Sequence, residues 1–358
     1  MKIVLLAAFL ACGPMQRSMA GDSIPVPASN VRYIDPTIGN VGRLLEPTRP
    51  TVQLPNQLIR FTPQRKDYMD DQISDFPLTI VSHRLGQVFA LKPSIHGTDD
   101  DAFDASFTYD HDLEVNRPWY YATWLIDDNI GVEFTAGRRT GLFRIQFPSG
   151  EDKALLFAPY NDGDPGWQFP SAREITGVET YHGDIKVYLY GEFNTPGTAV
   201  TQGRRTGVRF AANVRTVEFR YAISYISAGQ AKKTFDEEIK GRSFEQLSAA
   251  GQMEWTSVMS KINVTGGTTS QKRAFYTALY RCYERMVDIT EDGSYYSGYD
   301  KQVHKDARPF YVDDWSWDTY LALHPLRMIL EPSREQDMLQ SYVRMYEQSG
   351  WMPTFPVL

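Results

Sequence analysis

Three aspartates and two tryptophans lie within six residues near the carboxyl end of the chain, in the stretch YVDDWSWDTYLALHPL. They are Asp313, Asp314, Trp315, Trp317 and Asp318. The face of an indole ring stacks on the C–H face of a pyranose, and an adjacent carboxylate accepts hydrogen bonds from two neighbouring hydroxyls. This combination of side chains is typical of a sugar-binding site.

The same aspartates are poorly spaced to supply a complete catalytic pair. Hydrolysis of a glycoside with inversion needs an acid and a base about 6.5 to 9.5 Å apart on opposite sides of the ring. Asp313 and Asp314 are neighbours whose side chains diverge, and both share one short loop with Asp318. We therefore expect Asp313 and Asp314 to form a solvated acidic turn before a helix that starts near Thr319. Trp317 and Asp318 are the better candidates for a sugar clamp.

Other candidate motifs are weaker. His324 precedes Pro325 and is expected to pack at a helix end. The other histidines, His83, His96, His111, His182 and His304, are not spaced as zinc ligands. The loop TIGNVG contains Gly39 and Asn40, and it is either a tight turn that opens the first domain or a close approach to a ligand.

Composition and charge limit the class of protein. The chain has 358 residues, enough for two domains, and its 42% of hydrophobic residues suit an ordinary folded protein. The aromatic content of 13% suits either a large β-rich core or stacking surfaces for ring-shaped ligands. The net charge of −7 argues against nucleic acid as a partner, because phosphate binding needs basic surfaces.

Residues 1–20, MKIVLLAAFLACGPMQRSMA, have the pattern of a secretory signal peptide, with Lys2 before an apolar run and a small-residue cleavage site. The apolar run is too short to span a bilayer, so no transmembrane segment is expected after cleavage. Cys12 leaves lipidation open, although Phe9-Leu10-Ala11 is a poor sequence for it. Cleavage leaves Cys282 as the sole cysteine, and we expect a periplasmic or cell-surface protein without an internal disulfide.

The first half of the chain has the pattern of an all-β domain. VEFRYAISYIS alternates apolar and polar residues with a period of two, and LFRIQF, IKVYLYGEF and YYATWLI are further strands separated by Gly, Pro and Asp. Many short strands of this kind predict an antiparallel β-sandwich, which we place at residues 21–228.

Helical patterns follow. Ser243-x-x-Gln246 is a capping box before Leu247, Gly251, Trp255, Val258 and Ile262, which predicts a helical linker at 229–265. Two more capping boxes are expected, at Thr268 before a stripe of Phe275, Ala278, Leu279, Cys282 and Met286, and at Ser333 before a stripe of Leu339, Tyr342, Val343 and Tyr346. Residues 266–358 are therefore predicted to be all-α. The apolar ending GWMPTFPVL predicts that this helical domain is incomplete.

The order of several motifs resembles glycoside hydrolase family 92, a family of secreted α-mannosidases. The motifs are YIDPTIGN, TAGRRTGLFRIQFP, ISYIS, GGTTSQKRAFYTALYR, WDTYLALHPL and SGWMPTFP, and they cover essentially the whole chain after residue 20. The resemblance implies an N-terminal β-sandwich joined through linker helices to an (α/α)6 barrel, of which this chain would hold the first helices.

The resemblance also implies a mannose-binding site. Trp317 and Asp318 match the family's Trp-Asp pair, which contacts mannose in the −1 subsite, and Gly39-Asn40 resembles the loop that closes on that subsite. Members of the family are inverting and depend on Ca²⁺, a hard cation that prefers oxygen ligands. The general acid, the base and the calcium ligands are expected beyond Leu358, so no catalytic or metal-binding residue is assigned in this chain.

The chain departs from the family after the Gly39-Asn40 turn, and the family's SHTH-like segment is reduced to Ser82-His83-Arg84. We therefore expect a divergent exo-acting α-mannosidase for mannose-rich glycans, with this half inactive alone. Two alternatives are a non-catalytic carbohydrate-binding or interaction module built on the sandwich, and a different (α/α)6 glycosidase that uses Asp313 or Asp314.

Overall fold

The computed structural model describes residues 29–41, 48–82, 86–150, 152–182 and 184–356. The predicted signal peptide, its cleavage site and Cys12 lie outside these ranges. Within them, no helix is long and apolar enough to cross a bilayer.

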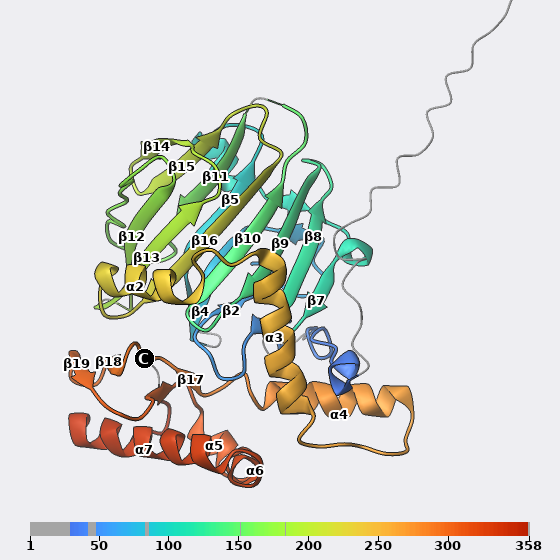
Figure 1. Ribbon diagram of the computed structural model, residues 1–358, viewed down its shortest axis with the longest axis vertical. Coiled ribbons are helices and arrows are strands. Elements are labelled where there is room, and N and C mark those ends of the chain that lie inside the picture. The colour runs from blue at the N-terminus through green and yellow to red at the C-terminus, as the bar shows by residue number, and fades with distance from the viewer. Residues whose placement is uncertain (1–28, 42–47, 83–85, 151, 183, 357–358) are drawn as a thin grey trace, which may run out of the picture.

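Two antiparallel sheets form the predicted β-sandwich (Figure 1). One has seven strands in the order β12 (Glu174–Tyr181), β13 (Ile185–Phe193), β16 (Thr216–Ser224), β10 (Thr140–Gln146), β9 (Ile130–Ala136), β8 (Tyr120–Leu125) and β7 (Val115–Arg117). The other has five, in the order β14 (Thr198–Gln202), β15 (Arg205–Phe210), β11 (Lys153–Ala158), β5 (Gly86–Ser94) and β4 (Phe76–Ser82).

Short elements complete this domain. They are the 3-10 helices η2 (Asn30–Tyr33) and η3 (His111–Leu113), the helix α1 (Asp100–Asp104), and the paired strands β1 (Val52–Gln53) with β2 (Arg60–Phe61) and β3 (Gln72–Ile73) with β6 (Phe107–Thr108). The first described strand therefore starts at Val52, after a loop that begins with η2.

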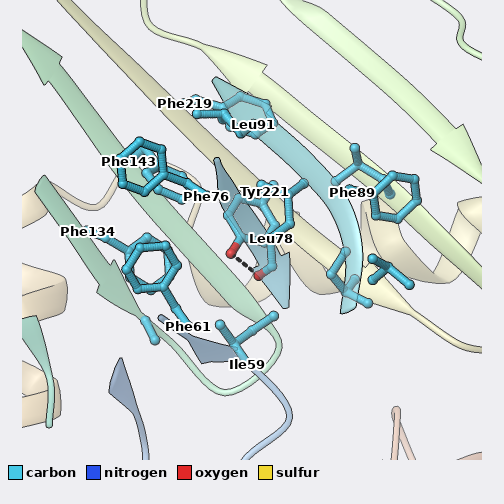
Figure 2. Close-up of a cluster of buried hydrophobic side chains, with 14 of the residues drawn as sticks. Ile59, Phe61, Phe76, Leu78, Phe89, Leu91, Phe134, Phe143, Phe219 and Tyr221 are labelled. Atoms are coloured by element: carbon cyan, nitrogen blue, oxygen red, sulfur yellow. Dashed lines mark hydrogen bonds between the residues drawn. The ribbon is translucent and has the colours of Figure 1, made fainter. Parts of the chain in front are cut away.

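The core lies between the two sheets and is rich in aromatic rings. The predicted inward face of β16 is confirmed, because Val217, Phe219, Tyr221 and Ile223 are fully buried. The alternation ends after Tyr221, since Ala222 and Ser224 on the other face are buried as well. Figure 2 shows neighbouring rings from different strands, and the ring centroid of Phe134 lies 4.6 Å from that of Phe143. The hydroxyl of Tyr221 donates a hydrogen bond to the carbonyl oxygen of Leu78 on the opposite sheet at 2.5 Å, which satisfies this buried polar group.

Helices cover the outer face of the seven-stranded sheet. α2 (Ala228–Glu238) packs on β13 and β16, and α3 (Phe244–Met259) packs on β9 (Figure 1). The capping box at Ser243 is confirmed, and the predicted stripe is buried as far as Val258. Ile262 lies beyond the end of the helix. The buried indole of Trp255 donates to the carbonyl oxygen of Gln53 at 2.8 Å and so ties α3 to the sandwich.

α4 (Thr269–Arg281) has the predicted capping box at Thr268, but the predicted buried face was only partly right: Leu279 and, beyond the helix, Met286 are buried as predicted. Phe275 and Ala278 are exposed, whereas Tyr276 and Tyr280 are fully buried. The two tyrosine hydroxyls donate to the backbone carbonyls of Ile262 and Thr51, at 3.0 and 2.6 Å. Because these hydrogen bonds satisfy the two hydroxyl groups, the tyrosine rings can be buried in the core. A prediction based on the spacing of apolar residues does not detect this.

The prediction for the last helix, α7 (Pro332–Ser349), was wrong in two respects. The helix starts at Pro332 with Glu331 as N-cap and no side-chain cap, because proline is suited to the first helical position. Of the predicted stripe, Tyr342 is buried as expected, but Leu339, Val343 and Tyr346 are exposed. Met338 and Met345 complete the buried face instead. The predicted end at Gly350 is confirmed, where the backbone is left-handed with φ of 78°.

The region after Gly266 is not all-α as predicted. It contains α5 (Ser316–Thr319) and α6 (Leu323–Leu330), but also β17 (Val287–Asp288) paired with β20 (Tyr311–Val312), and β18 (Ser294–Ser297) paired with β19 (Gln302–Lys305). Tyr295 stacks on Phe310 with ring centroids 3.9 Å apart, and both rings join the core of the sandwich. These strands are too short to show a period in the sequence, and their contact with the sandwich stabilises them.

Substitution of Gly141 tests the packing between the sheets. A Cβ atom at this position would lie 2.4 Å from the ring of Tyr221, which is buried and hydrogen-bonded to Leu78. We expect Gly141→Ala to lower the free energy of unfolding by about 1–3 kcal/mol through overpacking, measured by urea denaturation.

Gly229→Ala in the first turn of α2 is the matched control, because its Cβ would meet only Ser227 Oγ at 3.8 Å. Its stability should be unchanged or slightly higher. An equal loss in both variants would contradict the overpacking explanation.

Candidate sugar site

Asp313 is buried at the junction of the sandwich with the helical region. Its carboxylate forms an ion pair with Arg60 of β2 and accepts a hydrogen bond from Ser82 Oγ of β4 at 3.4 Å. Arg60 also donates to the carbonyl oxygens of Ile80 and Val81. The backbone of Asp313 is left-handed, with φ of 64°, a conformation that Asp tolerates better than most residues. A solvated turn was the wrong prediction, because this carboxylate joins the two regions.

Asp314 is buried as well and is held within the helical region. Its Oδ2 accepts hydrogen bonds from Thr319 Oγ1 at 2.9 Å, from the Tyr342 hydroxyl at 2.6 Å and from His324 Nε2 at 2.9 Å. The other ring nitrogen of His324 lies 2.6 Å from Glu335 Oε1 of α7. His324 is therefore an imidazole between two carboxylates rather than a simple packing residue at a helix end.

The charges of this cluster stabilise one another. Burial opposes ionisation, but the hydrogen bonds from His324, Tyr342 and Thr319 hold the pKa of Asp314 below its ordinary value. Burial also lowers the pKa of His324, yet the hydrogen bonds and charges of Asp314 and Glu335 outweigh it and raise that pKa to about 9. At neutral pH the imidazole is therefore protonated and donates from both nitrogens.

These contacts fix the loop that presents Trp317 and Asp318. The backbone nitrogens of Asp314 and Ser316 donate to the carbonyl oxygens of Pro356 and Thr354, at 3.0 and 3.2 Å, so the loop is also paired with the last described residues. The single helical turn of α5 then carries Trp317 and Asp318 outward from this rigid base.

Trp317 and Asp318 are both exposed. Trp317 is 52% exposed and stacks on Trp315 with ring centroids 6.1 Å apart, and its other ring neighbour is Phe355. Within the described residues, no side chain or backbone group forms a hydrogen bond or ion pair with the Asp318 carboxylate. A half-exposed indole and an exposed carboxylate are the two kinds of group that a sugar-binding site uses.

Gly39 and Asn40 form a turn that is anchored to α4. The buried amide of Asn40 donates to the Pro36 carbonyl at 2.8 Å and accepts from Thr48 Oγ1 and Arg281 Nη2, at 3.1 and 3.3 Å. Gly39 is exposed with φ of 85°, in the left-handed region that favours glycine. The Asn40 side chain is thus engaged within the fold, and Gly39 presents the open backbone of the turn.

Among the described residues, no hydrogen bond or ring contact joins this turn to Trp317 or Asp318. Two small pockets share Arg49, and the first of them is also lined by Asn40 of this turn. The first has room for about 40 Å³ and is lined by residues that include Asn40, Arg65 and Tyr68. The second, with room for about 10 Å³, is lined by residues that include Arg60 and Arg285 and holds no more than about one water molecule.

Arg285 connects the second pocket to the tryptophans, because its guanidinium lies over the Trp315 ring at 4.8 Å from the centroid. Burial lowers the pKa of Arg285, but an arginine remains protonated in proteins. Sequence reasoning missed Arg60, Arg285 and Glu335, and no local pattern marks them.

The described residues were also tested as a calcium site. Across residues 29–356, with the stated gaps, no group of three or more His, Cys, Asp and Glu side chains is arranged to hold a metal ion. Asp313 and Asp314, the most acidic pair near the tryptophans, are already committed to Arg60 and His324. These residues therefore do not fit a calcium centre by themselves.

Sequence profiles place this combination of sandwich, linker helices and Trp-Asp loop among the glycoside hydrolases. The profile of the glycosyl hydrolase family 92 N-terminal domain matches residues 33–224, and that of the family's catalytic domain matches residues 230–358. The chain belongs to glycosyl hydrolase family 92. No curated protein matches it.

Solved structures share the fold. The family GH92 inverting mannosidase BT2199 from Bacteroides thetaiotaomicron VPI-5482 is 23% identical, with a TM-score of 0.82 over 91% of this chain and 50% of that one. The family GH92 α-mannosidase BT3965 from Bacteroides thetaiotaomicron is 22% identical, with a TM-score of 0.79 over 92% of this chain and 51% of that one. The chain thus spans about half the length of these structures.

The His324 cluster predicts a dependence of stability on pH. The pKa of His324 is about 9 in the folded protein and about 6.5 in an unfolded chain. Its stabilising contribution is therefore complete below about pH 6.5 and is lost as the pH rises through about 9. We expect His324→Gln to lower the free energy of unfolding by about 3 kcal/mol or more at pH 6, and by progressively less toward pH 9.5.

Thermal and urea unfolding between pH 6 and 9.5 would measure this difference. His304→Gln is the control, because His304 pairs with Asp300 near the surface, where such pairs contribute less than about 1 kcal/mol. A His324→Gln deficit that stays constant over this pH range would contradict the assignment of a protonated imidazole.

Proposed function

We propose that the protein is an exo-acting α-mannosidase that hydrolyses terminal α-linked mannose from mannose-rich glycans with inversion. In this proposal Trp317 and Asp318 hold the terminal mannose, and the Gly39-Asn40 turn borders the same site. The observation that carries it is the exposed Trp-Asp pair on a buried, ion-paired base, in a chain of glycosyl hydrolase family 92.

The burial of the other acids supports a role for this chain in sugar binding rather than in bond cleavage. Asp313 and Asp314 are paired with Arg60 and His324, so neither is poised to transfer a proton to a glycosidic oxygen or to activate water. This argues against the alternative glycosidase that would use one of them as its catalyst. We infer that the general acid and base come from residues outside this chain, and that the chain alone binds the sugar without hydrolysing it.

The role of each binding residue follows from elementary chemistry. The Trp317 ring offers its face to the C–H groups of the sugar, and the Asp318 carboxylate accepts hydrogen bonds from two adjacent hydroxyls and so fixes the orientation of the ring. The rigid base beneath them limits the ordering entropy that binding would cost. Export to the periplasm or cell surface remains the prediction made from residues 1–20.

Substitution of the Trp-Asp pair tests this site. We expect Trp317→Ala and Asp318→Asn each to weaken binding of methyl α-mannoside by about tenfold or more, because a stacking face or a charge-assisted hydrogen bond is lost. Ligand-observed NMR titration of the 358-residue chain would measure the affinities.

Asp337→Asn is the matched control, because Asp337 is a partly exposed carboxylate that pairs with Arg308 at 3.3 Å. Its affinity should equal that of the parent chain. Unchanged affinity in both Trp317→Ala and Asp318→Asn would rule out the clamp. The carbohydrate-binding alternative predicts a different result for a longer protein that contains the whole catalytic region. It would be favoured if that protein bound mannose but hydrolysed no mannoside.

A calcium requirement is proposed for the complete enzyme, with ligands outside the residues described above. We expect EDTA to abolish hydrolysis of an α-mannoside by the complete enzyme and added Ca²⁺ to restore it. Binding of methyl α-mannoside to this chain should be unaffected by EDTA, because its described residues form no metal cluster. Turnover that continues at full rate in EDTA would count against the requirement.

A further inference from the structure

A third pocket lies in the sandwich, away from the helical region. It has room for about 130 Å³, more than either pocket that shares Arg49. The residues that follow β5, the turn between α1 and β6, and the end of β8 with the turn after it all contribute to its lining. We call it the β5–β8 pocket, and the lining residues that bear on its chemistry are His96, Ser106, Phe107, Leu125, Asp127 and Asp128.

The strand directions place this pocket far from Trp317 and Asp318. Ser82 at the end of β4 donates a hydrogen bond to Asp313 and pairs with Gly86, the first residue of β5. β5 has nine residues and ends at Ser94, which lines the pocket. A strand rises about 3.3 Å per residue, so roughly 25 Å of strand separates the pocket from the junction beneath the proposed clamp.

The floor of the β5–β8 pocket is apolar and rigid. Phe107 of β6 and Leu125 of β8 are buried side chains that belong to the core between the two sheets. The Phe107 ring stacks on the ring of Phe76, which also lies in this core. Because these side chains are fixed by packing before any ligand arrives, binding on this floor costs little side-chain entropy.

The rim of the pocket is polar and offers both donors and acceptors. His96 Nε2 lies 2.7 Å from Asp128 Oδ1, and the His96 side chain is 65% exposed. Asp127 and Ser106 are exposed too, and within the described ranges no residue forms a hydrogen bond with either side chain. An imidazole N–H donates, a carboxylate accepts and a hydroxyl does both, so the rim is equipped for a ligand that does both.

This chemistry discriminates between classes of ligand. The two carboxylates, Asp127 and Asp128, repel an anion. A metal ion is not favoured either, because across residues 29–356, with the stated gaps, no three His, Cys, Asp or Glu side chains are arranged to hold one. A sugar hydroxyl both donates and accepts, and a cavity of about 150 Å³ holds a six-membered ring, so a pyranose matches both the rim and the volume.

We propose that the β5–β8 pocket is a second, non-catalytic sugar site that binds a pyranose residue of the mannose-rich glycan. The pocket itself indicates a pyranose, and the choice of mannose rests on the proposed function. Two sites on one chain hold two residues of a branched or polymeric mannoside at once. The second binding event is then intramolecular, which raises the affinity for the polymer above that of either site.

Titration with methyl α-mannoside in a chain that carries Trp317→Ala tests the pocket while the clamp is disabled. Ligand-observed NMR should show residual, saturable binding. In this background Asp127→Asn and His96→Gln should each weaken it about tenfold or more, because an acceptor or a donor of the rim is lost. Ser106→Trp, at an exposed position, should abolish it by filling the pocket.

Two variants serve as matched controls. Asp162→Asn removes the charge of another exposed carboxylate, which lies between β11 and β12 and does not line the pocket. His304→Gln breaks the same kind of pair as His96→Gln, because His304 Nε2 lies 2.8 Å from Asp300 Oδ2. Neither should change the residual binding, and equal melting temperatures should show that all variants keep the fold.

A polymeric α-mannan tests the link between the two sites. The parent chain should bind it about tenfold or more tighter than chains with either Trp317→Ala or Ser106→Trp alone, because each single variant loses bivalency. Affinity electrophoresis in gels that contain the mannan would measure the difference. Equal retardation of the parent and the Ser106→Trp chain would overturn the proposal.

The pocket and the clamp can fail separately. Loss of all mannoside binding with Trp317→Ala would overturn the second site and leave the clamp standing. Residual binding that Ser106→Trp does not change would place the second sugar elsewhere and would also overturn the proposal. Binding that Ser106→Trp abolishes and Trp317→Ala leaves intact would support the pocket and overturn the clamp of the proposed function.

Discussion

Two adjacent carboxylates, Asp313 and Asp314, are buried where the sandwich meets the helices, and a buried charge is tolerated only when it is paired and hydrogen-bonded. The two carboxylates have partners in different parts of the fold. Asp313 is neutralised by Arg60 of the sandwich, and Asp314 is neutralised by His324 at the start of α6. The loop between β20 and α5 cannot shift without separating one of these pairs.

The exposed site depends on this constraint. A tryptophan and an aspartate on a free surface loop would lose considerable conformational entropy on binding a sugar. Here the loop is fixed by ion pairs below, by the backbone of residues 354–356 beside it and by stacking of Trp315 on Trp317. Asp313 and Asp314 therefore hold in place the loop that carries Trp317 and Asp318.

The same junction explains why cations gather near the proposed sugar site. Arg60 is needed to neutralise Asp313, and Arg285 packs against Trp315 at the surface of the same junction.

Much of the architecture could be predicted from local patterns. The period of two along β16 and the capping boxes at Ser243 and Thr268 depend on residues that are close in sequence, and all three appear in the structure. The prediction failed where distant contacts prevail. Tyr276 and Tyr280 are buried because their hydroxyls reach the carbonyls of Ile262 and Thr51, and the strands after Gly266 form because they pack against the sandwich.

The candidate site also has features that the sequence predicts and features that depend on distant contacts. The residue types alone identified Trp317 and Asp318 as sugar-binding candidates and made a complete acid–base pair on one loop implausible. Only the tertiary structure showed that Asp313 and Asp314 are buried, since their partners Arg60, His324 and Glu335 come from separate elements. Local periodicity is set by a residue's near neighbours, whereas the partner of a buried charge is set by the packing of the whole chain.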